Sequence, residues 1–242
     1  MNINSRNLKL TIGAIYLIVL TTGLFFLFSI IDLKDLTSYE FIRSNKDQIL
    51  EYKNNNFFFL SVTFFIFSII WVLLLGFGLP LLLFAGFVFG KWWGIILIIS
   101  STTIGATLLY ILAGLFFKDI IEQKLAPKFL KLKKFFNKNE ILYFTFFRFV
   151  GGGGLPYGIQ NVLPVLFDMS VRNYFISSFI GSFPSMFVTV ALADGIENYI
   201  GENDQISFMS AITSEEIYIP IIGFFIILLI AFTLKRFFFN KD

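Results

Sequence analysis

The stretch R-F-V-G-G-G-G-L-P-Y-G-I-Q-N-V-L-P, residues 148–164, places one arginine, four consecutive glycines and two prolines in a segment that is otherwise mostly apolar. Relative to alanine, a glycine in a helix interior costs about 1 kcal/mol and a proline about 3 kcal/mol, so this stretch cannot continue as an ordinary spanning helix. Inside a bilayer, broken backbone is tolerated only where it is buried in protein or lines a water-filled cavity. We therefore expect this stretch to line a site around which the rest of the chain packs.

The composition is that of a membrane protein. Of the 242 residues, 57% are hydrophobic, 35 are phenylalanine and only 14% are charged, too few to cover a soluble globular surface of this size. The absence of cysteine and histidine excludes disulfides, thiolate chemistry, haem ligation and the usual zinc sites. We predict no cofactor, no metal site and no enzymatic activity, because the buried polar residues offer no nucleophile paired with a base.

Four apolar segments are long enough to cross a bilayer core of about 30 Å as helices: 10–31, 94–117, 171–193 and 217–234. Two further apolar segments, 57–90 and 141–167, are interrupted by glycine and proline. If fully helical they would be about 51 Å and about 40 Å long, whereas two crossings need about 60 Å. Each is too long for one crossing and too short for two, so we predict that both are re-entrant hairpins.

The charges between these segments predict the topology. Segment 118–140 carries seven lysines against three acids, whereas 194–216 carries six acids and no basic residue. Both ends of the chain are basic, which places the N- and C-termini in the cytoplasm, here of a cell inner membrane. The termini and the charged loops alternate between the two sides of the membrane, as their charges require, only if each hairpin enters and leaves the membrane on the same face. The predicted fold is an all-α polytopic membrane protein with four spanning helices and two opposed re-entrant hairpins.

The predicted organisation has five parts. In chain order these are an N-terminal spanning helix (1–31), an outer amphipathic loop (32–56), a central domain with both hairpins (57–195), an outer acidic loop (196–216), and a C-terminal spanning helix with a basic tail (217–242).

The lysines from Lys118 to Lys138 alternate with apolar residues, so we predict an amphipathic helix that lies on anionic lipid headgroups. Charge alone would also suit nucleic acid, but a position between membrane segments favours lipid, and we predict membrane lipids and no nucleic acid as partners. Assembly into a homo-oligomer is left open.

The two halves of the central domain echo each other. A G-L-P triplet occurs at residues 78–80 and again at 154–156, and in each half a glycine follows the proline by 25 residues, at Gly105 and Gly181. Inverted repeats with broken helices in matching positions are a transporter arrangement that binds substrate near the midplane. We therefore predict that the two hairpins form an inverted repeat.

With these residues in view, the chain resembles the superfamily of DedA and SNARE-associated Golgi proteins, whose members share a VTT domain. The resemblance covers about residues 57–195. It rests on L-P-L-L-L-F-A-G-F-V-F-G at 79–90, followed by Gly94 and by Gly105 with Ala106, and on short motifs in the second half, namely Arg148 with Phe149, Pro156 with Tyr157 and Asn161, and Gly181 with Pro184. It implies two opposed re-entrant hairpins and movement or scrambling of lipids.

The chain departs from the DedA branch in two ways. That branch has an acid just after the first hairpin's proline and a second arginine six residues after the first, whereas this chain has Leu81 and Leu82 after Pro80, and Gly154 six residues after Arg148. The resemblance is therefore closer to the Golgi-protein branch.

Arg148 is the leading candidate site residue, because a charge at membrane depth costs roughly 2.5 to 3.5 kcal/mol and is by default functional. A guanidinium binds phosphate through two parallel hydrogen bonds, and a glycine-rich backbone offers N–H groups to the same anion. We predict a substrate-binding set of Arg148, Gly151, Gly152, Gly153, Gly154, Pro156, Gln160 and Asn161. The structural alternatives are that Arg148 extends to the cytoplasmic interface and that Gln160 and Asn161 cap broken helix ends.

Asp168 and Arg172 are four residues apart at the start of a span. We expect them to pair along one helix face, with a proton or headgroup relay as the second interpretation.

These features favour a transporter or scramblase for phosphate-bearing lipids, either phospholipids or polyprenyl phosphates. The alternative, from another class, is a non-transporting membrane organiser whose basic loop recruits partners.

Overall fold

The computed structural model contains only helical elements among the residues that it describes, namely 39–76, 78–119, 121, 123, 139–202 and 213–239, with 11, 18 and 22 as isolated positions. In chain order the elements are α3 (Tyr39–Leu73), α4 (Gly78–Phe116), α6 (Glu140–Phe149), the 3-10 turn η1 (Gly151–Gly154), α7 (Tyr157–Val162), the 3-10 turn η2 (Leu163–Phe167), α8 (Val171–Glu202) and α10 (Glu215–Phe239). This agrees with the predicted all-α class.

Three helical segments of the described chain are long and apolar enough to cross a membrane: Asn54–Leu73, Gly78–Phe116 and Val171–Tyr199. The second and third contain most of the predicted spans 94–117 and 171–193, and α10 contains the predicted span 217–234. Apart from three isolated positions, the predicted first span lies outside the described residues. The chain is therefore a helical, multi-pass membrane protein.

Two breaks divide α3 and α4 into straighter segments. Asn56 leaves helical geometry (φ −127°, ψ 25°), and Gly90 adopts φ 76°, ψ 169°, a conformation available essentially only to glycine. Between these breaks lie a first arm (57–73) and a second arm (78–89), and a return helix (91–116) follows Gly90.

The first and second arms pack side by side in opposite directions. The ring of Phe64 stacks on Phe84 with centroids 5.3 Å apart, and Phe57, one end of the first arm, meets Phe89 at 5.9 Å. A residue early in one arm thus contacts a residue late in the other. The two arms form a helical hairpin whose tip lies between Leu73 and Gly78.

The return helix runs parallel to the first arm. At its start the indole of Trp93 donates a hydrogen bond to Ser61 Oγ (3.1 Å), and further on Gly105 packs directly against Val72. A Cβ on Gly105 would lie 3.0 Å from Val72 Cβ, so glycine allows the two helices to approach this closely.

The second half of the domain repeats this plan with different elements. Helix α6 runs parallel to α8, because Ser177 Oγ donates to the carbonyl of Ile141 (3.2 Å) and Gly181 packs against Arg148. Between them η1, α7 and η2 lead the chain back. At the tip of this second hairpin, a Cβ on Gly158 would lie 2.9 Å from Leu75 Cδ2, so the tips of the two hairpins touch.

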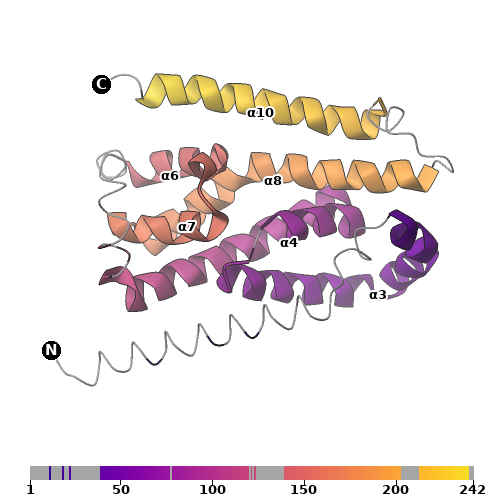
Figure 1. Cartoon of the computed structure of the whole chain (residues 1–242), viewed down its shortest axis with the longest axis horizontal. Helices are drawn as coiled ribbons and strands as arrows, with labels where there is room; N and C mark the ends of the chain where they lie inside the picture. Colours follow the sequence, from indigo (N-terminus) through magenta and orange to yellow (C-terminus); the bar gives the residue numbers. More distant parts are fainter. Residues whose placement is uncertain are drawn as a thin grey trace.

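The two halves point in opposite directions, because the return helix and α8 are antiparallel. Thr102 on the return helix lies against Met186 on α8, and Tyr110, further along, stacks on Tyr174, nearer the start of α8. Helices α3, α4, α8 and α10 therefore follow one another across the bundle, with α6 beside α8 and α7 beside α4 at one end (Figure 1).

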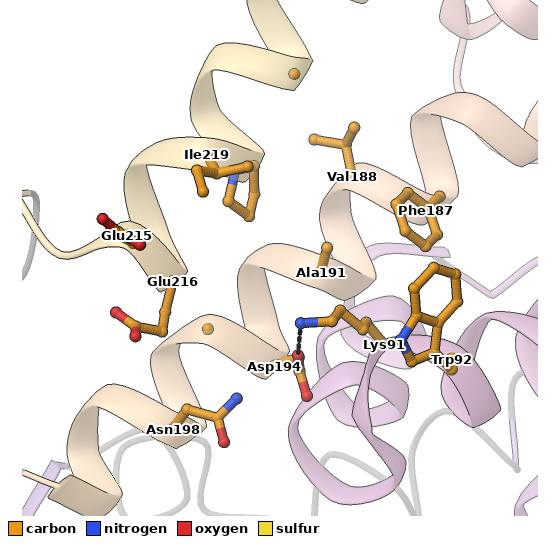
Figure 2. Close-up of a pocket in the computed structure, with 13 residues that line it drawn as sticks. Lys91, Trp92, Phe187, Val188, Ala191, Asp194, Asn198, Glu215, Glu216 and Ile219 are labelled. Carbon is orange, nitrogen blue, oxygen red and sulfur yellow. Dashed lines mark ion pairs between the residues drawn. The ribbon is translucent and has the colours of Figure 1, made fainter.

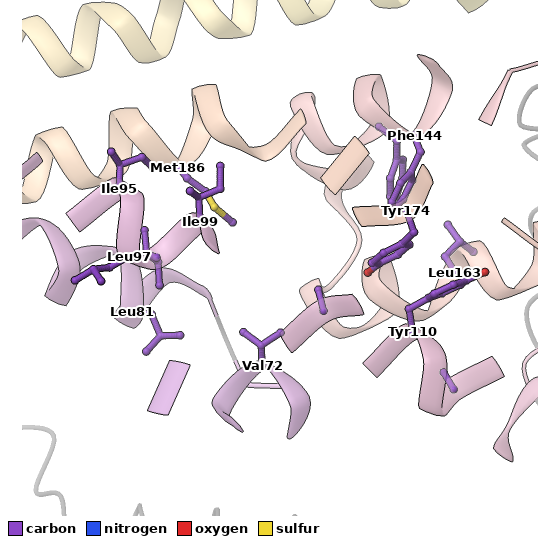
Figure 3. Packing of buried hydrophobic residues seen from close by; sticks show 14 of the residues in the cluster. Val72, Leu81, Ile95, Leu97, Ile99, Tyr110, Phe144, Leu163, Tyr174 and Met186 are labelled. Atoms are coloured by element: carbon purple, nitrogen blue, oxygen red, sulfur yellow. The ribbon is translucent and has the colours of Figure 1, made fainter. Parts of the chain in front are cut away.

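The buried core lies along the return helix and α8. Ile95, Ile99 and Met186 fill one end, and Tyr110, Phe144, Tyr174 and Leu163 fill the other, with Val72 between them (Figure 3). Outward-facing side chains of α3, α8 and α10 are mostly large and apolar, as expected of helices in contact with lipid.

Candidate functional site

Arg148 occupies the last turn of α6, next to the tip of the second hairpin. Helix α6 begins at a capped end, where the Asn139 side chain accepts a hydrogen bond from Leu142 N (3.0 Å), and it ends where η1 begins. Arg148 is only 4% exposed, so its guanidinium lies inside the protein instead of extending to the interface. This disfavours the interfacial alternative considered from the sequence.

Two polar side chains hold the guanidinium. Its Nη2 donates to Asn161 Oδ1 (2.7 Å) on α7 and to the hydroxyl of Tyr174 (2.8 Å) on α8. The Tyr174 hydroxyl in turn donates to the backbone carbonyl of Asn161 (3.2 Å). Arg148, Asn161 and Tyr174, which we call the arginine cluster, therefore tie together α6, the broken segment and α8.

Three aromatic rings surround the same charge. The guanidinium carbon lies 5.0 Å from the ring centroid of Phe144, 5.6 Å from that of Tyr174 and 5.9 Å from that of Tyr157. These cation–π contacts stabilise a desolvated cation without neutralising it.

The positive charge of the arginine cluster has no counter-ion in the part of the chain that the structure describes. Among the described residues Arg148 forms no ion pair, and two of the cluster's buried donors, Arg148 Nε and Asn161 Nδ2, have no hydrogen-bond partner there. Buried donors in native structures are almost always satisfied, so each such orphan calls for an explanation. A guanidinium with one free N–H of its own and one free amide donor beside it is the arrangement that an anion such as phosphate would complete.

The glycine run has a defined shape next to this cluster. Gly151, Gly152 and Gly154 have φ of 68°, 70° and 80°, where other residues are strained. Gln160 fastens the run, since its Nε2 donates to the carbonyls of Gly151 (3.1 Å) and Leu155 (2.6 Å). Gln160 thus has the structural duty that was the second interpretation of its sequence position, and Pro156 occupies the N-cap position of α7 without a side-chain hydrogen bond.

Gly152 and Gly154 provide a matched test of that contact. Both have positive φ, but a Cβ on Gly152 would overlap the Gln160 side chain, whereas the space around Gly154 is open. We expect Gly152→Ala to lower the thermal unfolding midpoint in detergent clearly more than Gly154→Ala, because only the first displaces Gln160. Equal midpoints for the two variants would contradict this role of Gln160.

Asp168 and Arg172 do not form the pair expected from their spacing. Asp168 lies before the start of α8, in a left-handed conformation (φ 52°), so the i, i+4 geometry of a helix does not apply. Its carboxylate forms an ion pair with Lys118 Nζ instead. The other lysines of the predicted basic surface, from Lys124 to Lys138, lie outside the described residues.

The ion pair between Lys118 and Asp168 is largely exposed, with side chains 42% and 66% accessible. Exposed pairs contribute about 0 to 1 kcal/mol. We expect Asp168→Asn to leave the unfolding midpoint within error of the wild type in moderate salt. A large loss of stability would indicate that this carboxylate has a further, buried partner.

Tyr174 is the site residue that sequence reasoning missed. It is fully buried, and its ring stacks on Tyr110 at 4.5 Å. Its only signal in the sequence is that a tyrosine in an apolar helix needs a hydrogen-bond partner for its hydroxyl. That partner is Arg148, which the fold brings to Tyr174 from the last turn of α6.

The matching positions of the two halves differ in polarity. Val72 and Arg148 each stand eight residues before the proline of their G-L-P triplet, and each packs against the later glycine, Gly105 or Gly181. Val72 is fully buried and apolar. The guanidinium is therefore confined to one of two similarly built hairpins.

Comparison with known proteins identifies the domain that contains this cluster. Residues 76–195 match the model of the VTT domain. The chain is 27% identical over 186 residues to a protein of Dictyostelium discoideum named "Transmembrane protein 41 homolog", an alignment that covers 73% of this chain and 53% of that protein. The chain thus spans about half the length of this curated relative. No solved structure matches the chain significantly.

The matched region contains the second arm of the first hairpin, the return helix, the arginine cluster and most of α8. Because the family model and the relative agree, the chain belongs to the DedA/VTT superfamily of membrane proteins.

Proposed function

We propose that this protein moves phosphate-bearing lipids across its membrane, as a transporter or scramblase, and that the arginine cluster contacts the lipid phosphate. The observation that carries the proposal is the buried guanidinium of Arg148, which has no counter-ion among the described residues and whose Nε, like the adjacent Asn161 Nδ2, lacks a hydrogen-bond partner there. A buried charge is costly unless it is paired, so the site is most stable when an anion is present.

The membrane arrangement that we propose has four spanning helices and two re-entrant hairpins that enter from opposite faces as an inverted repeat. It is supported by the antiparallel arms of the first hairpin, by the opposite directions of the return helix and α8, and by the contact between Leu75 and Gly158. Two tips that meet inside the bundle bring broken backbone to the depth where a headgroup must be sheltered during crossing.

We further propose a cell inner membrane with both termini in the cytoplasm, following the basic ends and the lysines from Lys118 to Lys138. In that orientation the lysines lie at the same face as the start of α6, where anionic headgroups would gather. Phospholipids and polyprenyl phosphates share the phosphate that Arg148 would bind, and experiment distinguishes them.

The test is reconstitution of the purified full chain into vesicles. Headgroup-labelled phospholipid and a labelled polyprenyl phosphate are followed separately, with and without a pH gradient. Movement of either lipid faster than in protein-free vesicles supports the proposal, and dependence on the gradient would identify coupled transport. Vesicles that move neither lipid would contradict it and would favour a membrane organiser.

A further inference from the structure

A cavity lies at the end of the bundle opposite to the arginine cluster, between α8, the start of α10 and the bend of α4 at Gly90 (Figure 2). Its volume is about 460 Å³, within the roughly 300 to 1,000 Å³ of typical small-molecule sites. None of its lining residues belongs to the arginine cluster. Along α8, its Asp194 stands about 30 Å from Tyr174, so the two sites are separate.

One wall of the cavity is apolar. The rings of Trp92 and Phe187 pack with centroids 5.6 Å apart, and Ile219 and Pro220 face them from α10. Trp92 is 68% exposed and follows Lys91 directly, a pairing typical of interfacial anchors. Acyl chains of a lipid in the adjoining leaflet can lie against this wall.

The remaining wall is polar and mostly acidic. Asp194, Glu215 and Glu216 line it together with Asn198, and Lys91 is the one basic residue among the lining residues. Lys91 Nζ lies 3.4 Å from Asp194 Oδ2, and the Asp194 side chain is only 13% exposed. Glu215 and Glu216 are exposed at the first turn of α10 and form no ion pair among the described residues.

This distribution of charge selects a class of ligand. Three carboxylates and one ammonium attract a positively charged group and repel a simple anion. In the described part of the chain these carboxylates do not form a group that could hold a metal ion. A ligand with an ammonium for the glutamates, a phosphate for Lys91 and apolar chains for the Trp92 wall matches all three surfaces of the cavity.

We propose that this cavity binds the headgroup of a zwitterionic, amine-bearing phospholipid, of the ethanolamine or choline type. Glu215 and Glu216 bind the ammonium, Lys91 binds the phosphate, and Trp92 and Phe187 contact the upper part of an acyl chain. The proposal goes beyond lipid movement at Arg148, because it concerns a second site at the other end of α8 that binds lipid whether or not the protein transports it.

The test uses quenching of Trp92 fluorescence by phospholipids with brominated acyl chains. The full chain is reconstituted in vesicles with EDTA, and brominated phosphatidylethanolamine, phosphatidylcholine and phosphatidylglycerol are compared at equal mole fraction. The signal of Trp92 is obtained by subtracting the fluorescence of Trp92→Phe from that of the wild type. This subtraction removes the contributions of Trp71 and Trp93. We expect either zwitterionic lipid to quench Trp92 at least about threefold more than phosphatidylglycerol, and the stronger of the two identifies the amine.

The double variant Glu215→Gln/Glu216→Gln should lose this preference. Glu197→Gln should keep the preference, because the Glu197 carboxylate lies on α8 near Asp194 but does not line the cavity. Arg148→Gln should also keep it, which separates this site from lipid movement. Equal quenching by all three lipids, a preference that survives the double variant, or one that appears only when calcium replaces EDTA would overturn the proposal.

Discussion

We expect Arg148→Gln to lower the rate of lipid movement at least about tenfold in reconstituted vesicles. A hydrogen bond to a charged group is worth about 1.5 to 3 kcal/mol, and glutamine removes both the charge and the fork of donors that a phosphate would use. The glutamine side chain remains polar, so it can still bond Asn161 and Tyr174, which lie 2.7 Å and 2.8 Å from the guanidinium. The folded protein should therefore persist, and its unfolding midpoint is measured in the same preparation.

Arg172→Gln is the matched control, because Arg172 is exposed and follows the second hairpin closely, yet belongs to no described contact. It should move lipid at the wild-type rate. Arg148→Lys keeps the charge but not the planar fork, so an intermediate rate is expected if phosphate is bound through two parallel bonds. A wild-type rate in folded Arg148→Gln would exclude the arginine cluster as the phosphate contact.

Much of the site could be predicted from the sequence because its signals are local. Four glycines and a proline beside an arginine exclude a regular helix wherever the rest of the chain goes, and a lone charge in an apolar run must be accommodated somehow. These arguments identified Arg148 and the breaks around it. They also placed Asn161 in the site, where it now accepts a hydrogen bond from the guanidinium.

What the sequence could not predict depends on contacts between distant segments. Tyr174 reaches Arg148 only because α6 packs along α8, and Gln160 fastens the glycine run only because the chain turns back there. Asp168 was expected to lie on a helix with Arg172, but the helix begins after Asp168. The left-handed backbone conformation of Asp168 places its carboxylate next to Lys118. The cavity at Lys91 combines residues from three helices and has no local signature at all.

The distance in sequence from each G-L-P triplet to its later glycine, by contrast, corresponds to a contact between distant segments. The glycine that follows each G-L-P triplet by 25 residues packs against the helix before that triplet, Gly105 against Val72 and Gly181 against Arg148. Equal spacing therefore reflects equal packing of a hairpin on its own return helix. The difference lies in what stands opposite the glycine, a valine in one half and the site's arginine in the other.

We expect Gly181→Val to be among the most damaging single substitutions in the chain. A Cβ on Gly181 would overlap the carbonyl of Thr145 and would lie 2.7 Å from Arg148 Cβ, so α6 and α8 must separate. Overpacking of this kind typically costs about 1 to 3 kcal/mol, and a clash with backbone lies at the upper end. The unfolding midpoint in detergent should fall by roughly 5 to 10 °C, whereas Gly114→Val, whose nearest neighbour is 4.0 Å away, should change it little.

The smaller substitutions Gly181→Ala and Gly105→Ala separate stability from function. Both glycines pack on the backbone of the helix before their own triplet, so both variants should lose stability to a similar degree. Only Gly181→Ala displaces Arg148 relative to Tyr174 and Asn161, so among folded molecules it should lower lipid movement much more than Gly105→Ala. Equal losses of lipid movement in the two variants, at equal stability, would mean that the rate of lipid movement depends on the packing of both hairpins. Such a result would contradict a special role for the Arg148 guanidinium in the second half.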